Sequence, residues 1–321
     1  MMPGFAWRPI AVCLIIAIAI SVFVPLSLHG ADVSGPQIAL TFDDATRGPG
    51  PFFDGPERTR RLVDALQRAD VDEAMFFVTT RNVDRQGETG SARIHAYTGA
   101  GHTLGNHSHS HQWLSRTDTD EYIADLDLAA QKLASFENVQ PLYRYPFLDE
   151  GRGVEKRDRL RQALAERGIR NAYVTVDTYD WYLDALAQEA QEAGREMDID
   201  KLRSLYVDVI VSGTEFYDAI AKQTLGRSPQ HVLLLHENDL AALFIGDLVA
   251  ELRNRGWTII PATEAFADPI AEIQPDTLFL GQGRVAAIAH EAGATPASLV
   301  SREEDEDYLK RRFENEVIEA Y

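Results

Sequence analysis

Short apolar runs alternate with amphipathic stretches through most of this chain, and this alternation constrains the fold more than any other feature. Five such runs contain little polar alternation: Ile38–Phe42, Ala74–Thr79, Ala172–Val176, His231–Leu235 and Trp257–Ile260. Strands that are buried on both faces have this pattern. Weaker candidates lie near His102–Gly105 and Leu142–Tyr145. We therefore expect an α/β fold with about seven parallel strands, either a barrel or a doubly wound sheet.

The stretches between the strand candidates have helical character. We expect helices over four windows: Glu57–Ala69, Thr119–Phe136, Glu155–Arg167 and Asp247–Arg255. Gly168 and Gly256 directly follow the last two of these, where helix ends favour glycine. A longer insertion over residues 183–229 is predicted to form two helices packed on the sheet. Residues 269–321 are predicted to form a C-terminal helical extension with a solvated, charged end.

The N-terminus contains 19 uncharged residues, Ile10–Leu28, preceded by a single Arg8. This segment predicts that residues 1–31 are a signal peptide or an N-terminal membrane anchor. A buried core helix is a weaker reading, because the segment is terminal and apolar on every side. We expect an exported protein that is periplasmic, secreted or anchored to the outer face of the cytoplasmic membrane, with its main domain over residues 32–268.

The charge and the cysteine content exclude some classes of partner and of metal site. The 321 residues contain 50 acidic and 31 basic side chains, a net charge of −19. This charge argues against nucleic acid as a partner, because binding phosphates needs a basic surface. It makes a neutral or cationic partner easier to bind than a strongly anionic one. The single cysteine excludes an intrachain disulfide and a cysteine-rich zinc site. Any metal would have to be bound by histidines and carboxylates.

Several polar clusters follow the predicted strands. Asp43 and Asp44 end the first strand, where α/β folds place their active sites. His107 and His111 are four residues apart, a spacing that would put both imidazoles on one face of a helical turn. Two histidines and a carboxylate form a typical catalytic metal site. The sequence therefore predicts such a site here.

Three further clusters stand at predicted strand ends. Arg144 follows one strand and could pair with an aspartate of the first cluster. Asp177 and Asp180 follow another. His236 ends the run Leu233–Leu235, and its ordinary pKa near neutrality suits general acid catalysis. Because carboxyl ends of parallel strands share one edge, we expect all of these side chains to converge.

As an ordered set, these motifs resemble those of the polysaccharide deacetylase family, the NodB-homology carbohydrate esterases. The similarity covers about residues 37–266. It rests on TFDD at residues 41–44, HSHSH at 107–111, RYPF at 144–147, DTYDW at 177–181 and LLLH at 233–236. The resemblance implies a deformed (β/α) barrel of about seven strands. It also implies removal of acetyl groups from acetylated glycans with one divalent metal ion, Zn²⁺ by preference and Co²⁺ or Ni²⁺ as alternatives.

The resemblance assigns roles to the metal ligands and to the proton-transferring residues. Asp44, His107 and His111 would bind the metal. Asp43 would be the general base that activates the attacking water, and His236 the general acid that protonates the leaving amine.

It also assigns supporting roles. Arg144 would orient Asp43, while Asp177 or Asp180 would tune His236 or Arg144, a choice that the sequence leaves open. The backbone N–H of Phe147 would bind the oxyanion, at a position where the family usually has Tyr. Trp181 and Leu234 would line the acetyl pocket.

The expected reaction is hydrolysis of N-acetyl groups of a GlcNAc-containing polymer or oligomer of peptidoglycan or chitin type. Two alternatives use the same scaffold: an esterase of O-acetylated polysaccharide or another C–N amide hydrolase, and a non-catalytic glycan-binding protein. The sequence gives no oligomeric state.

Overall fold

A curled sheet of parallel strands forms the centre of the computed structural model, which describes residues 35–318 together with Met1 and Gly4. Within this part of the chain the sheet contains seven strands: β1 (Gln37–Ala45), β2 (Met75–Val78), β3 (Thr103–Asn106), β4 (Val139–Tyr143), β5 (Arg170–Asn171), β6 (Gln230–His236) and β7 (Thr258–Ile259). Their order is β5-β4-β3-β2-β1-β6, and β7 pairs with the beginning of β1. The α/β fold and the deformed barrel predicted from the sequence are confirmed.

The segment after β5 differs from the predicted strand Ala172–Val176. Only Arg170 and Asn171 pair as a regular strand, on β4, and Ala172 N–H still donates to Tyr143 O. The chain then crosses to β6, where Val176 forms an isolated parallel bridge with Leu233. There the Thr175 hydroxyl accepts from Val232 N–H at 2.7 Å, in place of a backbone carbonyl. This side-chain contact interrupts the ladder, and the segment joins both edges of the sheet as a distorted strand.

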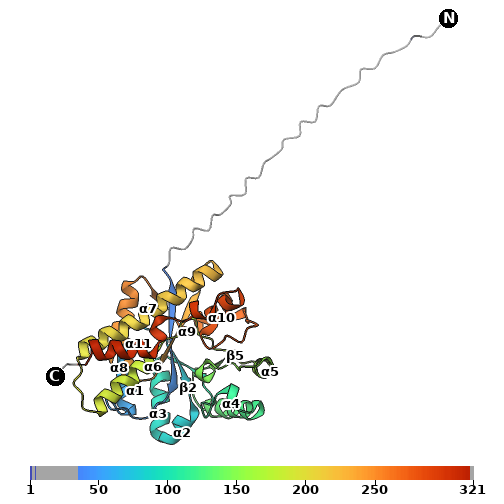
Figure 1. The fold of residues 1–321 in the computed structure, drawn as a ribbon. Coiled ribbons are helices and arrows are strands. Elements are labelled where there is room, and N and C mark those ends of the chain that lie inside the picture. Colours follow the sequence, from blue (N-terminus) through green and yellow to red (C-terminus); the bar gives the residue numbers. More distant parts are fainter. Residues whose placement is uncertain (2–3, 5–34, 319–321) are drawn as a thin grey trace. The chain divides into compact units, whose positions relative to one another are not determined.

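Helices surround the sheet (Figure 1). They are α1 (Gly55–Arg68), α2 (Thr80–Gln86), α3 (Glu88–Gly99), α4 (Thr119–Leu133), α5 (Val154–Glu166), α6 (Asp180–Glu192), α7 (Ile199–Leu225), α8 (Asp239–Asn254), α9 (Ala262–Ala265), α10 (Gly283–Glu291) and α11 (Glu306–Glu316), with short 3₁₀ turns at Leu114–Arg116, Pro146–Leu148, Pro269–Glu272, Pro296–Ser298 and Arg302–Glu304. Side-chain caps begin several of them: Asp54, Asp118, Asp198 and Asn238 each accept a hydrogen bond from a backbone N–H of the first turn.

The insertion and the C-terminal region pack against the same body. The two helices expected between residues 183 and 229 are present as α6 and α7, although α6 begins at Asp180 and α7 is 27 residues long. The C-terminal α11 buries Leu309 and Phe313, so only part of its surface is solvated. The α7 helix ends at Gly226, whose φ of 72° is a left-handed cap that favours glycine.

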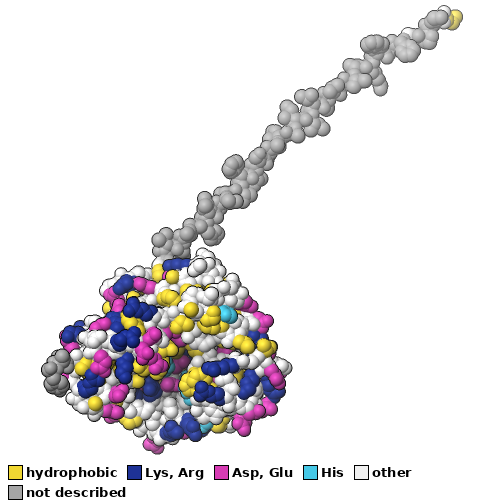
Figure 2. Space-filling view, in the orientation of Figure 1, with side chains coloured by type: hydrophobic (Ala, Val, Ile, Leu, Met, Phe, Trp, Pro, Cys, Tyr) yellow, Lys and Arg dark blue, Asp and Glu magenta, His cyan; other side chains and the backbone are white. Residues whose placement is uncertain are grey.

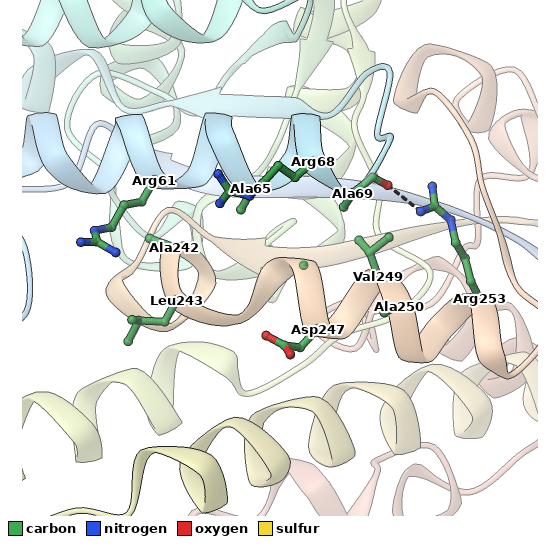
Figure 3. Close-up of a pocket in the computed structure, with 11 residues that line it drawn as sticks. Arg61, Ala65, Arg68, Ala69, Ala242, Leu243, Asp247, Val249, Ala250 and Arg253 are labelled. Atoms are coloured by element: carbon green, nitrogen blue, oxygen red, sulfur yellow. Dashed lines mark hydrogen bonds between the residues drawn. The ribbon is translucent and has the colours of Figure 1, made fainter.

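Helices α1 and α8 lie side by side on the outer face of the sheet, and small residues line the groove between them (Figure 3). Ala65 of α1 and Ala69, which directly follows that helix, face Ala242 and Ala250 of α8 across this groove. Arg253 donates to the carbonyl of Ala69 and so closes the end of α1. No described helix is both long and apolar enough to cross a membrane, and the predicted targeting segment 1–31 lies outside the described residues apart from Met1 and Gly4.

Candidate active site

The predicted catalytic residues converge at the carboxyl edge of the sheet. Strand β1 pairs with β6 in a register that places Asp43 opposite His236. Along the same edge, His107 follows β3 and Arg144 follows β4. The backbone continues this alignment, since His107 N–H donates to Val78 O and Arg144 N–H to Asn106 O. Parallel pairing therefore brings residues far apart in sequence into one layer, as expected.

Asp44, His107 and His111 form a compact group of potential metal ligands. One ligand atom from each lies within 4.8 Å of the others. Asp44 Oδ1 is 3.1 Å from His111 Nε2 and 3.7 Å from His107 Nε2. His107 is fully buried, whereas Asp44 and His111 are partly open to the cavity described below.

The expectation of a helical turn at residues 107–111 is wrong. This segment is an irregular loop in which Ser108 and His111 have φ values of 66° and 58°. Side chains hold it: Asn106 Oδ1 accepts from Ser108 N–H, and Ser108 Oγ accepts from His111 N–H. The two imidazole rings still converge, with centroids 4.9 Å apart.

A carboxylate from α4 also holds this loop in place. Asp125 of α4 accepts hydrogen bonds from the backbone N–H groups of His109 and Ser110. These side-chain acceptors take the place of the backbone carbonyls of a helix. The spacing of the histidines thus correctly predicted their proximity, although for a different local reason.

The protonation of these three residues suits a divalent cation. Burial lowers the pKa of His107 and His111 to about 4, so both imidazoles are neutral at physiological pH. Although burial alone would raise the pKa of Asp44, nearby His111, His236 and His107 hold it well below its ordinary value. His107 Nδ1 lies 2.8 Å from Arg144 O, which places the proton on Nδ1 and leaves the Nε2 lone pair facing Asp44. One carboxylate and two imidazoles match the donors that zinc-type ions prefer.

Asp43 lies beside this group and is paired with Arg144. Arg144 Nη1 donates to Asp43 Oδ1 at 2.9 Å, and both side chains are buried. The other carboxylate oxygen, Oδ2, is 3.6 Å from His107 Nε2. Burial raises the pKa of Asp43 to about 6, although the Arg144 guanidinium acts in the opposite direction. A carboxylate in this state is ionised at neutral pH and basic enough to accept a proton.

The structure distinguishes Asp180 from Asp177, which the sequence did not. Asp180 is fully buried, and its Oδ1 lies 2.7 Å from His236 Nδ1. Its Oδ2 accepts from the backbone N–H of His236 and from Asn238 Nδ2. Burial alone would lower the pKa of His236, but the charge and hydrogen bond of Asp180 raise it to about 9. The imidazole is therefore held protonated, with Nε2–H as the free donor.

Asp177 occupies a different position, in the cavity lining. Its Oδ1 accepts from Thr178 N–H at 2.8 Å, and no described contact joins it to His236 or Arg144 by a hydrogen bond. Burial raises the pKa of Asp177 to about 7.

A cavity of about 530 Å³ opens over these groups. Its lining includes the predicted substrate contacts Phe147, Trp181 and Leu234. Phe147 has a φ of 59° and is 44% exposed, and its ring stacks on Trp113 with centroids 3.9 Å apart. Trp181 is 37% exposed. These rings give the cavity two aromatic walls of the kind that sugar faces contact.

Sequence reasoning missed several residues of this lining, among them Trp113, Tyr179 and Gln282. Trp113 lies two residues beyond His111 and could have been suspected from that nearness. Gln282 precedes α10 in the C-terminal region and reaches the cavity only through tertiary packing. There, Tyr217 hydroxyl lies 2.9 Å from Gln282 Oε1.

Arg47, also missed, enters the cavity from a loop that a buried ion-pair network holds. Glu237 accepts from Arg47 N–H and from Arg93 Nη2, each at 2.7 Å. Arg93 Nη1 donates in turn to Arg47 O. Arg58 pairs with Asp239 at 2.7 Å and donates to Gly48 O. The only sequence signal was the acidic residues that directly follow His236.

Comparisons with known proteins agree with these motifs. Residues 30–172 match the model of a protein family described as "Polysaccharide deacetylase". Over these residues the chain is similar to the polysaccharide deacetylase family. A peptidoglycan-N-acetylglucosamine deacetylase from Bacillus cereus is 29% identical over 153 residues, which are 46% of this chain and 49% of that protein. The chain therefore spans about half the length of this curated relative.

Several solved structures are also similar to this chain. A family 4 carbohydrate esterase from Streptomyces lividans in complex with acetate has 18% identity and a TM-score of 0.47, covering 70% of this chain and 91% of that one. A family 4 esterase from Streptococcus mutans has 21% identity and a TM-score of 0.48, covering 71% and 86%. A pseudoenzyme of that family from Bacillus anthracis has 17% identity and a TM-score of 0.48, covering 72% and 65%.

Proposed function

We propose that this polysaccharide deacetylase family protein is a metal-dependent hydrolase that removes N-acetyl groups from a GlcNAc-containing polysaccharide or oligosaccharide. The observation that carries the proposal is the arrangement in one cavity of three potential metal ligands, a carboxylate paired with an arginine, and an imidazole paired with an aspartate. Amide hydrolysis needs a base for the water and an acid for the leaving amine, and the arrangement offers one of each.

Asp44, His107 and His111 would hold the cation, with Zn²⁺ as the first expectation and Co²⁺ or Ni²⁺ as alternatives. When bound, such an ion lowers the pKa of water and polarises an acetyl carbonyl. Support comes from the donor set, from the mutual approach of the ligand atoms within 4.8 Å, and from the Nδ1 contact that orients His107.

Asp43 would act as the general base. Its Oδ2 is the oxygen that Arg144 leaves free, and it faces the ligand group at 3.6 Å from His107 Nε2. Arg144 would keep the carboxylate oriented, because it also donates to the Thr41 hydroxyl and the Ala172 carbonyl and so cannot rotate freely.

His236 would act as the general acid and donate its Nε2 proton to the leaving nitrogen. Asp180 would hold the ring through Nδ1 and keep it protonated. The amine is a poor leaving group without that proton. Asp43 and His236 are paired on neighbouring strands, and both line the same cavity.

The remaining predicted residues would position the substrate. The backbone N–H of Phe147 would donate to the developing oxyanion. Leu234 and Trp181 would enclose the acetyl methyl group, and the stacked rings of Phe147 and Trp113 would contact a sugar face. Asp177, inside the lining, would add a polar contact of its own.

Acetate release from N-acetylchitooligosaccharides, measured with and without chelator, tests the proposal. We expect release that depends on added Zn²⁺. Parallel assays on acetylated xylan distinguish an O-acetyl esterase, which would release acetate from the xylan and little from the GlcNAc oligomers. No acetate from any acetylated glycan by the metal-loaded protein would refute the deacetylase proposal and leave another C–N amide hydrolase or a non-catalytic glycan-binding protein.

The uncharged segment 10–28 supports export, and we propose that the protein acts on a glycan outside the cytoplasm. Tracking the protein in periplasmic, secreted and membrane fractions tests this placement.

A further inference from the structure

A second cavity of about 410 Å³ adjoins the candidate active site and is lined by arginines. Its lining shares Asp44, Arg47 and His111 with the larger cavity, so the two hollows adjoin at these residues. It adds Arg81 and Arg85, together with the polar residues Thr79, Asn82 and Ser110. Nothing in the proposed chemistry uses these side chains.

Arg81 and Arg85 lie on one face of α2, because they are four residues apart. Both are exposed, and no carboxylate of residues 35–318 forms an ion pair with either. The helix is tied to the metal-ligand loop: Thr80 N–H donates to Ser108 O, and Arg81 N–H donates to His109 O. Lys and Arg side chains gather in Figure 2 where Figure 1 places α2.

Arg47 brings a third guanidinium to the same cavity. Its backbone is held on both sides, since Arg47 N–H donates to Glu237 and Arg47 O accepts from Arg93. Its side chain is 34% exposed, and the nearest carboxylate, Asp184, is 3.9 Å away. This loop is therefore rigid, and its guanidinium is only weakly paired.

The cavity also contains polar groups without partners. The Thr79 hydroxyl is buried and makes no hydrogen bond within the described chain. The Asn82 side-chain amide, one helical turn away, has no described hydrogen bond either. The Thr79 hydroxyl oxygen has almost no exposed surface, so it makes the cavity wall polar without being open to a ligand.

The charge balance of this cavity is positive. Three arginines face one carboxylate, Asp44, whose charge a bound divalent cation would neutralise. Three like charges around one hollow repel each other unless an anion enters, and guanidinium groups pair with carboxylates in bidentate geometry. The cavity is therefore a positively charged site in a chain whose net charge is −19.

We infer that this cavity is an anion subsite that binds a carboxylate of the glycan, carried by a sugar next to the one that is deacetylated. The inference rests on the proposed function, because the nearness of the two cavities matters only if the acetylated sugar lies over Asp44. It replaces the expectation of a neutral or cationic glycan, which considered the net charge alone, with a substrate that carries acidic sugars.

The test compares oligosaccharides of equal length with and without the charge. The probes are a GlcNAc tetramer, a tetrasaccharide that alternates GlcNAc with N-acetylmuramic acid, one that alternates GlcNAc with glucuronic acid, and the carboxamide forms of the two acidic probes. For wild type we expect kcat/KM on at least one acidic probe to exceed that on its carboxamide by about tenfold. The two acidic probes distinguish a lactyl carboxylate from a uronic acid.

Variants of the two α2 arginines test whether they cause the preference for the acidic probe over its carboxamide. The double variant R81Q/R85Q should bring the acid-to-amide ratio close to one, and R81K/R85K should retain most of it. Arg68→Gln is the matched control, since Arg68 is exposed on α1, has no ion pair in the described chain and is absent from both cavities. It should leave the ratio unchanged. Metal content and melting temperature check that each variant is folded.

The inference is overturned if wild type does not discriminate acid from amide, or if R81Q/R85Q keeps the wild-type ratio. Calorimetric binding of the same probes gives the ratio of Kd values without turnover. If wild type releases no acetate from any probe, the proposed deacetylase function fails, while the Kd ratio still decides whether the arginines bind a carboxylate.

Discussion

Replacing Asp180 by asparagine tests the link between a buried carboxylate and the proposed acid. The change keeps the size of the side chain but removes a charge that lies 2.7 Å from His236 Nδ1. An asparagine NH₂ group that donates to Nδ1 requires this nitrogen to be unprotonated, so the imidazole would be neutral and its Nε2–H a much weaker acid. Because general acid catalysis is typically worth 10²- to 10⁴-fold, we expect kcat to fall by about 10²- to 10³-fold.

The pH dependence gives a more specific signature. The protonated ring is the active form of an acid, and a pKa raised to about 9 keeps it protonated through neutral pH. The alkaline limb of the kcat profile should therefore lie above pH 8 in the wild type. In Asp180→Asn the pKa of His236 falls, and the limb should move to lower pH by about one to two units.

Asp184→Asn is a matched control for this experiment. Asp184 lies on the same helix, is equally buried, and accepts from the backbone N–H groups of Asp239 and Leu240 rather than from His236. It should lower stability and leave the alkaline limb in place. The reasoning is refuted if Asp180→Asn retains kcat within about threefold and shows the wild-type profile, or if both variants shift the limb equally.

Three further results are expected. His107→Ala should lower both the Zn²⁺ affinity and the activity by at least about tenfold. The affinity is measured by competition with a colorimetric chelator, and an unchanged affinity would show that His107 is not a metal ligand. Glu237→Gln should cost about 3–5 kcal/mol in urea unfolding, since it breaks a buried pair with Arg93, and a loss below about 1 kcal/mol would contradict that pairing. Dialysis against chelator should abolish acetate release and added Zn²⁺ should restore it; activity that survives a verified loss of metal would exclude a metal role.

Most of the site could be predicted because parallel strands end at one edge. Asp43 and His236 stand in register on neighbouring strands, so a pattern of polar residues after apolar runs was enough to bring them together. The family motifs then supplied the roles. The strand at 172–176 was mispredicted in detail because apolar composition reports burial, whereas the hydroxyl of Thr175 decides where the ladder breaks.

What the sequence could not supply depends on contacts between distant segments. The loop at 107–111 is shaped by Asn106 and by Asp125, a helix residue with no local signal for that role. Asp180, the first residue of α6, contacts His236 on β6, and no local sequence signal distinguishes it from Asp177 for that contact. Gln282 reaches the cavity from beyond the region that resembles the family motifs, so only the folded chain relates it to the site.

The division of labour between two adjacent carboxylates, Asp43 as base and Asp44 as ligand, is the central claim. Metal content and acetate release of Asp43→Asn and Asp44→Asn, measured on the same preparations, test it most directly. We predict that Asp43→Asn retains one metal ion per chain and loses activity by about 10²- to 10⁴-fold, whereas Asp44→Asn loses the metal as well. An Asp43→Asn protein that loses the metal, beside an Asp44→Asn protein that keeps it, would contradict the assignment.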